Sequence, residues 1–98
     1  MIQSTVLIYE NINDKVNAFK NGKPVLENTL LTLAKTNILV NKKKIAKITY
    51  VQSSTGECDY IIHLNSENIE DLMMAINILR EIPQIRDTKT HIGPVIYP

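Results

Sequence analysis

The chain has 98 residues, which suits one domain and leaves no room for a second. A hydrophobic fraction of 44% and a charged fraction of 21% indicate a globular protein and exclude a disordered one. The formal net charge of +1 provides no general field that would attract nucleic acid or anionic lipid.

The first ten residues, MIQSTVLIYE, have no basic flank, and their apolar run is too short for a signal peptide or a membrane span. Cys58 is the single cysteine, so an intrachain disulfide is excluded and a reducing compartment is favoured. We therefore expect a soluble cytoplasmic protein without membrane attachment.

The segment Thr5–Tyr9 predicts a strand buried on both sides, because it is rich in β-branched and aromatic residues and apolar on both faces. In the polar stretch that follows, Val16 and Phe19 are three residues apart and fit one helical turn. Pro24 suits the first position of a helix, where its missing N–H has no intrahelical partner. That helix continues with apolar residues at helical spacing, namely Leu26, Leu30, Leu33 and Ala34. The next segment, TNILVNKKK, leaves the end of the helix undefined.

The segment Ile45–Val51 predicts a second strand. Strict alternation assigns its side chains to two faces, with Ala46, Ile48 and Tyr50 on one and Lys47 and Thr49 on the other. The polar stretch QSSTGE then predicts a hairpin turn, in which Gly56 can supply a positive φ without steric cost. The return strand is Asp59–Leu64.

The second helix has the clearest pattern in the chain. We expect Asn65 or Ser66 to cap it and Pro83 to stop it. Its predicted buried stripe is Ile69, Leu72, Met73, Ile76 and Leu79, opposite Glu70, Asp71, Asn77 and Arg80. The final strand is predicted at Ile85–Ile92, before a short apolar tail.

These elements predict one α+β domain over residues 1–98, with the ferredoxin-like order β-α-β-β-α-β and a four-stranded antiparallel sheet. Two helices cover only one face of such a sheet, and the other face is too apolar to remain hydrated. A small core also favours association. We therefore expect a dimeric α+β barrel or a larger homo-oligomer.

Few residues suggest chemistry on their own. His63, His91 and Cys58 are the only soft metal ligands, and the first strand is expected to separate the two histidines. Cys58 stands between two acids that oppose a thiolate, so we do not expect a nucleophile. The sequence predicts no metal, cofactor or catalytic residue. The lysine-rich stretch NKKKIAK permits a phosphate-binding patch, but its position on an expected edge strand favours protection against unwanted pairing.

Three motifs in order point to a family. They are TGECDYIIHL (residues 55–64), NIEDLMMAINILREIPQI (residues 68–85) and RDTKT (residues 86–90). At these spacings the stretch from Ile45 to Ile92 resembles the effector-binding domain of the leucine-responsive and asparagine-activator regulators, the Lrp/AsnC family, also called the RAM domain.

The resemblance implies that an amino acid or related metabolite binds between subunits. The residues implicated are Ser54, Thr55, Gly56, Glu57, Cys58, Asp59, Thr88 and Thr90. Main-chain N–H groups around Gly56 would hold the ligand's carboxylate, and Asp59 would pair with its ammonium group. Ordinary turn chemistry, in which Asp59 accepts hydrogen bonds from neighbouring amides, remains an alternative.

The sequence also departs from the family pattern. Only four residues precede the first strand, so we expect no direct contact with nucleic acid and a transcriptional effect only through a DNA-binding Lrp-like partner. The segment Asn11–Lys23 is longer than the family needs. The alternative function is a small dimeric α+β barrel enzyme resembling a monooxygenase, which would require His63, His91 or Tyr60 to converge on a cavity. A third alternative is a purely oligomeric scaffold that no longer binds a ligand.

Overall fold

The computed structural model describes residues 1–11, 19–20 and 23–93. The elements, in chain order, are β1 (Ile2–Glu10), β2 (Phe19–Lys20), β3 (Lys23–Pro24), α1 (Val25–Thr36), β4 (Ile38–Val40), β5 (Lys43–Ser53), β6 (Tyr60–Ser66), α2 (Ile69–Arg80) and β7 (Ile85–Ile92). With the three shortest strands set aside, this is the predicted order of strands and helices. The α+β class and the bounds of β7 are confirmed.

The main sheet is antiparallel and has five strands in the order β4-β5-β6-β1-β7. The predicted four-stranded sheet therefore lacked β4. Asn37, with φ of 64°, ends α1 by donating its N–H to the Leu33 carbonyl at 2.8 Å. After β4, Asn41 and Lys42 have φ of 51° and 65° and form the tight turn into β5. The segment left undefined by the sequence is thus a strand, a turn and the start of another strand.

The strand β5 contains a bulge at Thr49. Ile48 lies opposite Leu64 in β6, whereas Tyr50 lies opposite His63, so Thr49 is an extra residue in the ladder. The bulge reverses the alternation of side chains along the strand. Tyr50 therefore does not share a face with Ile48, and the predicted assignment was wrong for this residue. Tyr50 is 45% exposed and stacks on the His63 ring with centroids 4.7 Å apart.

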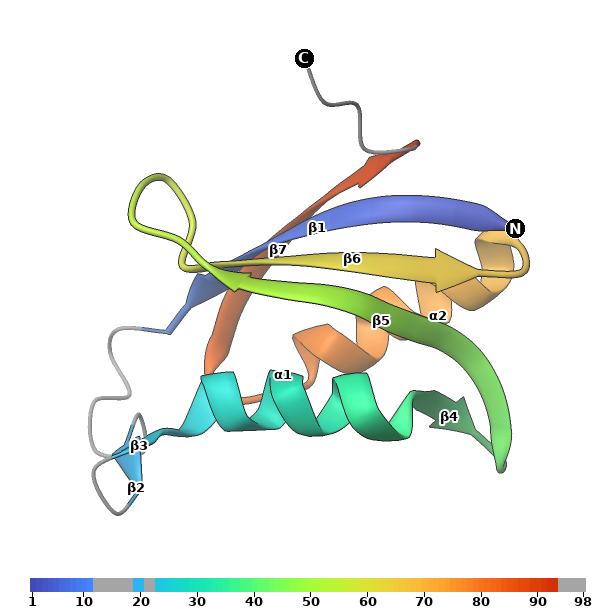
Figure 1. The fold of residues 1–98 in the computed structure, drawn as a ribbon. Helices are drawn as coiled ribbons and strands as arrows, with labels where there is room; N and C mark the ends of the chain where they lie inside the picture. The colour runs from blue at the N-terminus through green and yellow to red at the C-terminus, as the bar shows by residue number, and fades with distance from the viewer. Residues whose placement is uncertain (12–18, 21–22, 94–98) are drawn as a thin grey trace.

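Both helices lie on the same side of the main sheet, as predicted (Figure 1). The core fills the space between the helices and the sheet. Its fully buried side chains are Val6, Ile8, Leu26, Leu30, Ile38, Ile62, Leu64, Leu72 and Leu79. We call the opposite side of the sheet, turned away from α1 and α2, the open face.

Two predicted helix starts need correction. The strand β6 continues through Ser66, and Asn68 caps α2 by accepting the Asp71 N–H on its side chain at 2.8 Å. Ile69 and Met73 are 48% and 56% exposed, so the buried stripe of α2 does not include them. Asp71, which was predicted on the opposite face, is 7% exposed and belongs to the buried side. Pro24 is the N-cap of α1 and not its first helical residue.

In the segment before α1, Phe19 lies in β2 and not in a helical turn. Val16, most of the long segment Asn11–Lys23 and the apolar tail after Gly93 lie outside the described residues.

Along the open face, neighbouring strands place their side chains in rows. Thr5 of β1 pairs with His63 on one side and with His91 on the other, so β1 separates the two histidines as predicted. In the next row Leu7 lies between Ile61 and Lys89. Leu7 and Ile61 are half-buried, and they form the apolar centre of this face.

Candidate functional site

The turn between β5 and β6, residues 54–59, is tied to the neighbouring strand as well as to itself (Figure 1). The Ser54 N–H donates to the Asp59 carbonyl at 2.8 Å and closes the hairpin. The Asp59 N–H donates to the carbonyl of Ile8 in β1 at 2.9 Å. Cys58 is buried, whereas Thr55 and Gly56 are exposed. The tip of the turn is therefore exposed to solvent and its base is held by β1.

Asp59 already has a structural contact. Its Oδ2 accepts the main-chain N–H of Glu10 at 2.8 Å, and the residue is half-buried. This contact is the one that ordinary turn chemistry predicts for an acid at this position. The pKa of Glu10 is raised, first by burial and second by the negative charge of Asp59. The two carboxyl groups thus place negative charge at the end of β1.

Glu57 joins the turn to the open face. Its Oε1 accepts a hydrogen bond from Tyr9 Oη at 3.1 Å and an ion-paired contact from Lys89 Nζ at 3.0 Å. Hydrogen bonds from Lys89 and then Tyr9 lower the pKa of Glu57, and the pairing with Glu57 raises the pKa of Lys89. The Lys89 ammonium and the Arg86 guanidinium each lie 5.6 Å from the centre of the Tyr9 ring. We call Tyr9, Glu57 and Lys89 the clamp.

Gly56 does not use the left-handed conformation that its position in the turn suggested. Its φ is not positive, and a Cβ added there would meet nothing within 4 Å. The turn itself therefore does not require glycine at this position. The absence of a side chain leaves the main chain at the tip open to close approach by another molecule.

Neither threonine of β7 that the sequence implicated is among the residues that contact the turn of residues 54–59 in the described part of the chain. Thr88 pairs with Ile8 on the helix side of the sheet and is buried, with its Oγ1 accepting from Arg80 Nε of α2 at 3.0 Å. Thr90 is exposed and pairs with Val6. Lys89, between them, reaches Glu57. Alternation along β7 contained this signal, because it sends Lys89 to the opposite face from its neighbours.

The residues named for an enzymatic alternative do not gather in one place. Tyr60 is buried and pairs with Ile8 on the helix side, whereas His63 and His91 share the open face row with Thr5. Within the described ranges, no group of three or more His, Cys, Asp or Glu side chains is placed to hold a metal ion. Neither described helix has the length and apolar character needed to cross a bilayer.

Comparisons with known proteins agree with this architecture. The family model for the Lrp/AsnC ligand binding domain matches residues 37–93. No curated protein matches the chain. Among solved structures, FFRP-DM1 superposes with a TM-score of 0.62 at 19% identity, covering 96% of this chain and 100% of that one.

Two further structures have the same fold. The hypothetical protein PHS023 from Pyrococcus horikoshii has a TM-score of 0.62 at 16% identity, covering 99% of this chain and 94% of its own. The protein TTHA0845 from Thermus thermophilus has a TM-score of 0.59 at 18% identity, covering 100% of this chain and 99% of its own. At these identities the structures support the fold alone. The match of the family model over more than half of the chain shows that the chain belongs to the Lrp/AsnC ligand-binding domain family.

Proposed function

We propose that this chain is a non-catalytic effector-binding and oligomerisation module. In this proposal, an amino acid or related small metabolite binds at the turn of residues 54–59, where two subunits meet. Binding stabilises one assembly and modulates transcription through a DNA-binding partner of the same family. Membership of the Lrp/AsnC ligand-binding family supports a regulatory module, and the turn's geometry supports the position of the ligand.

The observation that carries the proposal is the open main chain at Gly56 three residues from the carboxylate of Asp59. A zwitterion needs hydrogen-bond donors for its carboxylate and an acid for its ammonium group. Exposed peptide N–H groups without a neighbouring side chain meet the first need. A half-buried Asp59, fixed by the Glu10 N–H, presents its charge in a defined direction and meets the second.

The open face supports the location between subunits. Its centre consists of Leu7 and Ile61, and Tyr50, which pairs with His63 in the neighbouring row, is 45% exposed. Both helices lie on the opposite side, so this apolar surface is available to a second copy (Figure 1). The clamp links the turn to the same face through Glu57. A ligand at the turn is therefore positioned to contact both copies and to favour the assembled state by mass action.

Thermal denaturation with each of the common amino acids tests the proposal. A ligand at about 100 times its Kd adds about 2.7 kcal/mol to the free energy of unfolding. For a domain of this size, each kcal/mol raises the melting temperature by roughly 4–8 °C. We expect at least one amino acid to produce a shift of this order. No shift with any of them would contradict ligand sensing.

Two substitutions locate the site. Asp59→Asn keeps an oxygen that can accept the Glu10 N–H but removes the negative charge, so we expect the fold to persist and ligand binding to fall about tenfold or more. Gly56→Ala meets no steric obstacle among the residues that the structure describes, so a loss of binding there would reflect obstruction of the ligand. Glu70→Gln, which removes an exposed carboxylate on α2, is the control. If both turn variants bind as the wild type does, the ligand does not lie at this turn.

A further inference from the structure

The positive charge of this chain is concentrated in one stretch of sequence. Residues 28–56 contain five lysines and no acidic residue, whereas the rest of the chain contains six basic and ten acidic residues. The net charge of +1 is therefore the sum of +5 in this stretch and −4 elsewhere. Four of the five lysines lie around the turn that joins β4 to β5. We call them the lysine cluster, which consists of Lys42, Lys43, Lys44 and Lys47.

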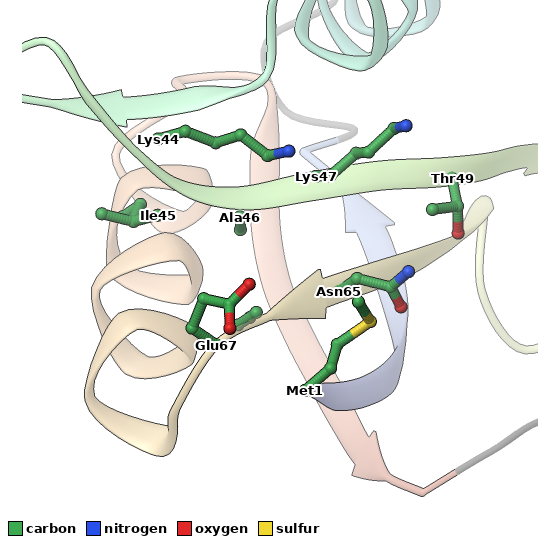
Figure 2. A pocket seen from close by; sticks show the side chains of 9 residues that line it. Met1, Lys44, Ile45, Ala46, Lys47, Thr49, Asn65 and Glu67 are labelled. Carbon is green, nitrogen blue, oxygen red and sulfur yellow. The ribbon is translucent and has the colours of Figure 1, made fainter.

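A bulge in β5 brings two of these lysines to one side of the sheet. The ladder between β4 and β5 shifts its register at Ile45, which is an extra residue of β5. Ile45 and Ala46 are both buried, although regular alternation would place neighbours on opposite faces. Lys44 and Lys47 are three positions apart, so without the extra residue they would also lie on opposite faces. Figure 2 shows their ammonium groups on the same side of β5.

The lysine cluster lacks counter-charges in the part of the chain that the structure describes. All four of its residues are exposed. The ion pairs found among the described residues join α2 to β7 and β7 to the turn of residues 54–59, and none involves the cluster. Glu67 lines a pocket with Lys44 and Lys47, but Figure 2 shows it on the other side of β5 from both ammonium groups. The four like charges therefore repel one another, and a polyanion would relieve that repulsion.

Protection of a sheet edge does not explain the first part of the cluster. The edge of the sheet is β4, which pairs with β5 from Lys43 to Ala46. Lys43 and Lys44 are therefore on an interior strand, and the edge position expected for them from the sequence was wrong. Lysines that guard against unwanted pairing belong on the exposed edge itself.

The backbone of the turn gives a second reason to assign the cluster a role. Asn41 and Lys42 have φ of 51° and 65°, which is the left-handed conformation of a two-residue hairpin turn. Asparagine tolerates this conformation, but for most other residues with a side chain it costs free energy, so glycine is favoured at the second position. Lys42 thus occupies a position where the fold alone favours glycine. Backbone strain at a charged residue points to a function of its side chain.

The chemistry of the lysine cluster fits the phosphate groups of double-stranded DNA. Lysine is a strongly hydrated point charge that is used in phosphate contacts but is depleted in protein–protein interfaces. Residues 38–47 contain no aromatic side chain on which the bases of a single strand would stack. The strand β4 adds one exposed apolar side chain, Leu39, which is too small a surface for stable insertion into a membrane. A two-stranded β-ribbon also fits the major groove of B-DNA, which is about 12 Å wide.

We propose that the lysine cluster binds the phosphate backbone of double-stranded DNA without reading its sequence. In the function proposed above, the chain reaches DNA only through a regulator of the same family, so direct contact is an addition to that function. From the sequence we expected no such contact, because net charge alone does not reveal a local concentration of lysines. The cluster lies at the start of β5, and the turn of residues 54–59 follows its end, so DNA binding does not depend on a ligand at that turn.

Fluorescence anisotropy with a short labelled DNA duplex, measured at several salt concentrations, tests the proposal. Each lysine that contacts a phosphate releases a counterion, so the logarithm of the affinity should fall linearly with the logarithm of the salt concentration, with a slope of about −2 to −4. A second duplex of the same length and unrelated sequence should bind equally well, because no base is read. The absence of binding to either duplex at low salt would overturn the proposal.

Single substitutions locate the contact. Lys44→Gln and Lys47→Gln should each make the salt slope less steep by about 1 and weaken low-salt binding about threefold or more. The matched control is Arg86→Gln, which removes one exposed positive charge from β7 at the opposite edge of the sheet and should leave the slope unchanged. Equal losses in Arg86→Gln and Lys44→Gln would indicate a general charge effect and contradict a site at the cluster.

Lys42→Gly tests the turn by a combination of results that a purely structural role does not give. Glycine adopts a positive φ without steric cost, so this variant should unfold at a higher urea concentration than the wild type. Because it also loses a phosphate contact, it should bind the duplex about threefold or more weakly. Unchanged affinity for the duplex would count against the proposal, whatever the change in stability.

Competition identifies the class of partner. Polyglutamate and vesicles of phosphatidylserine mixed with phosphatidylcholine, each at the same concentration of negative charge as the duplex, should displace it poorly. Equal displacement by polyglutamate would assign the cluster to an acidic protein, and equal displacement by vesicles would assign it to a membrane, and either result refutes the proposal. Asp59→Asn should bind the duplex as the wild type does even where it loses the effector, which separates a failure of this site from a failure at the turn.

Discussion

Glu10 and Glu57 lie on either side of the base of the turn and respond to pH in opposite directions. Burial and the charge of Asp59 raise the pKa of Glu10, so its ionised form costs the folded state free energy. Hydrogen bonds from Lys89 and Tyr9 lower the pKa of Glu57, so its ionised form stabilises the folded state. The ionised Glu57 therefore stabilises the folded turn, whereas the ionised Glu10 destabilises it.

The clamp predicts a pH-dependent difference between wild type and Glu57→Gln. Because the pKa of Glu57 is lowered, its stabilisation is present above its ordinary value of 4.5 and is lost as pH falls through the lowered pKa. We expect wild type to unfold at higher urea than Glu57→Gln at neutral pH and at the same urea in strong acid. High salt should shrink the neutral-pH difference, since the pair is exposed. A difference that persists unchanged in acid would contradict the clamp.

Glu10→Gln should behave in the opposite sense. Removing the charge that opposes Asp59 from this half-buried side chain should stabilise the protein at neutral pH by up to about 1 kcal/mol. The gain should fade as pH drops through the raised pKa of Glu10, where the wild-type side chain is itself neutral. Urea unfolding at several pH values measures this. A destabilised Glu10→Gln at neutral pH would show that its charge has a favourable partner.

Thr88 is predicted to act in stability and not in ligand binding. Thr88→Val preserves shape but removes the oxygen that accepts from Arg80 Nε, at a cost of about 1 kcal/mol. Thr90→Val, at an exposed position, should change the free energy of unfolding by less than about 0.5 kcal/mol. Chemical denaturation measures the free energy of unfolding of both variants. Titration with the effector should give both variants the affinity of the wild type. Lost affinity with normal stability in Thr88→Val would place Thr88 in the site.

At the scale of single elements, the start of α2 depends on one side chain. Asn68→Ala removes the acceptor for the Asp71 N–H and should cost about 1 kcal/mol. Asn65→Ala lies within β6 and serves as the control, with an expected change of less than about 0.5 kcal/mol. Guanidinium unfolding compares the two. A larger loss in Asn65→Ala than in Asn68→Ala would contradict the assigned cap.

The elements with a regular pattern were predictable from sequence, and those shaped by a neighbouring strand were not. Periodic apolar residues and Pro83 located α2. The predicted bounds of the final strand agree with β7. The Thr49 bulge was not predicted, because a pattern of period two assumes an unbroken hydrogen-bond ladder between the strands. The strand β4 was not predicted, because its three residues are too few to show an alternation of apolar and polar side chains.

The same distinction applies to the candidate site. The position of the turn followed from local residues, since Gly56 and the polar residues around it mark a hairpin. The clamp did not, because Tyr9 and Lys89 reach Glu57 only through the pairing of β1 with β7. Alternation along β7 places Lys89 on the face opposite to Thr88 and Thr90, but the side chains that it meets there depend on the pairing with β1, which no single stretch of sequence records.

For the whole molecule, assembly through the open face is the property on which the proposed sensing depends. Ile61→Lys places a charge at the apolar centre of this face and should yield a monomer, because an unpaired charge would be buried between subunits. Leu31→Lys, at a position on α1 that is 44% exposed, should assemble as the wild type does. Size-exclusion chromatography with light scattering measures both. Equal masses for the wild type and Ile61→Lys would exclude this face from the interface.

Sedimentation equilibrium of the wild type at micromolar concentration, with and without the amino acid that most raises its melting temperature, tests the account most directly. We predict a dimer or larger assembly that the ligand strengthens, and no strengthening in Asp59→Asn. A wild-type protein that remains monomeric at every concentration, both with and without the ligand, would contradict effector binding between subunits.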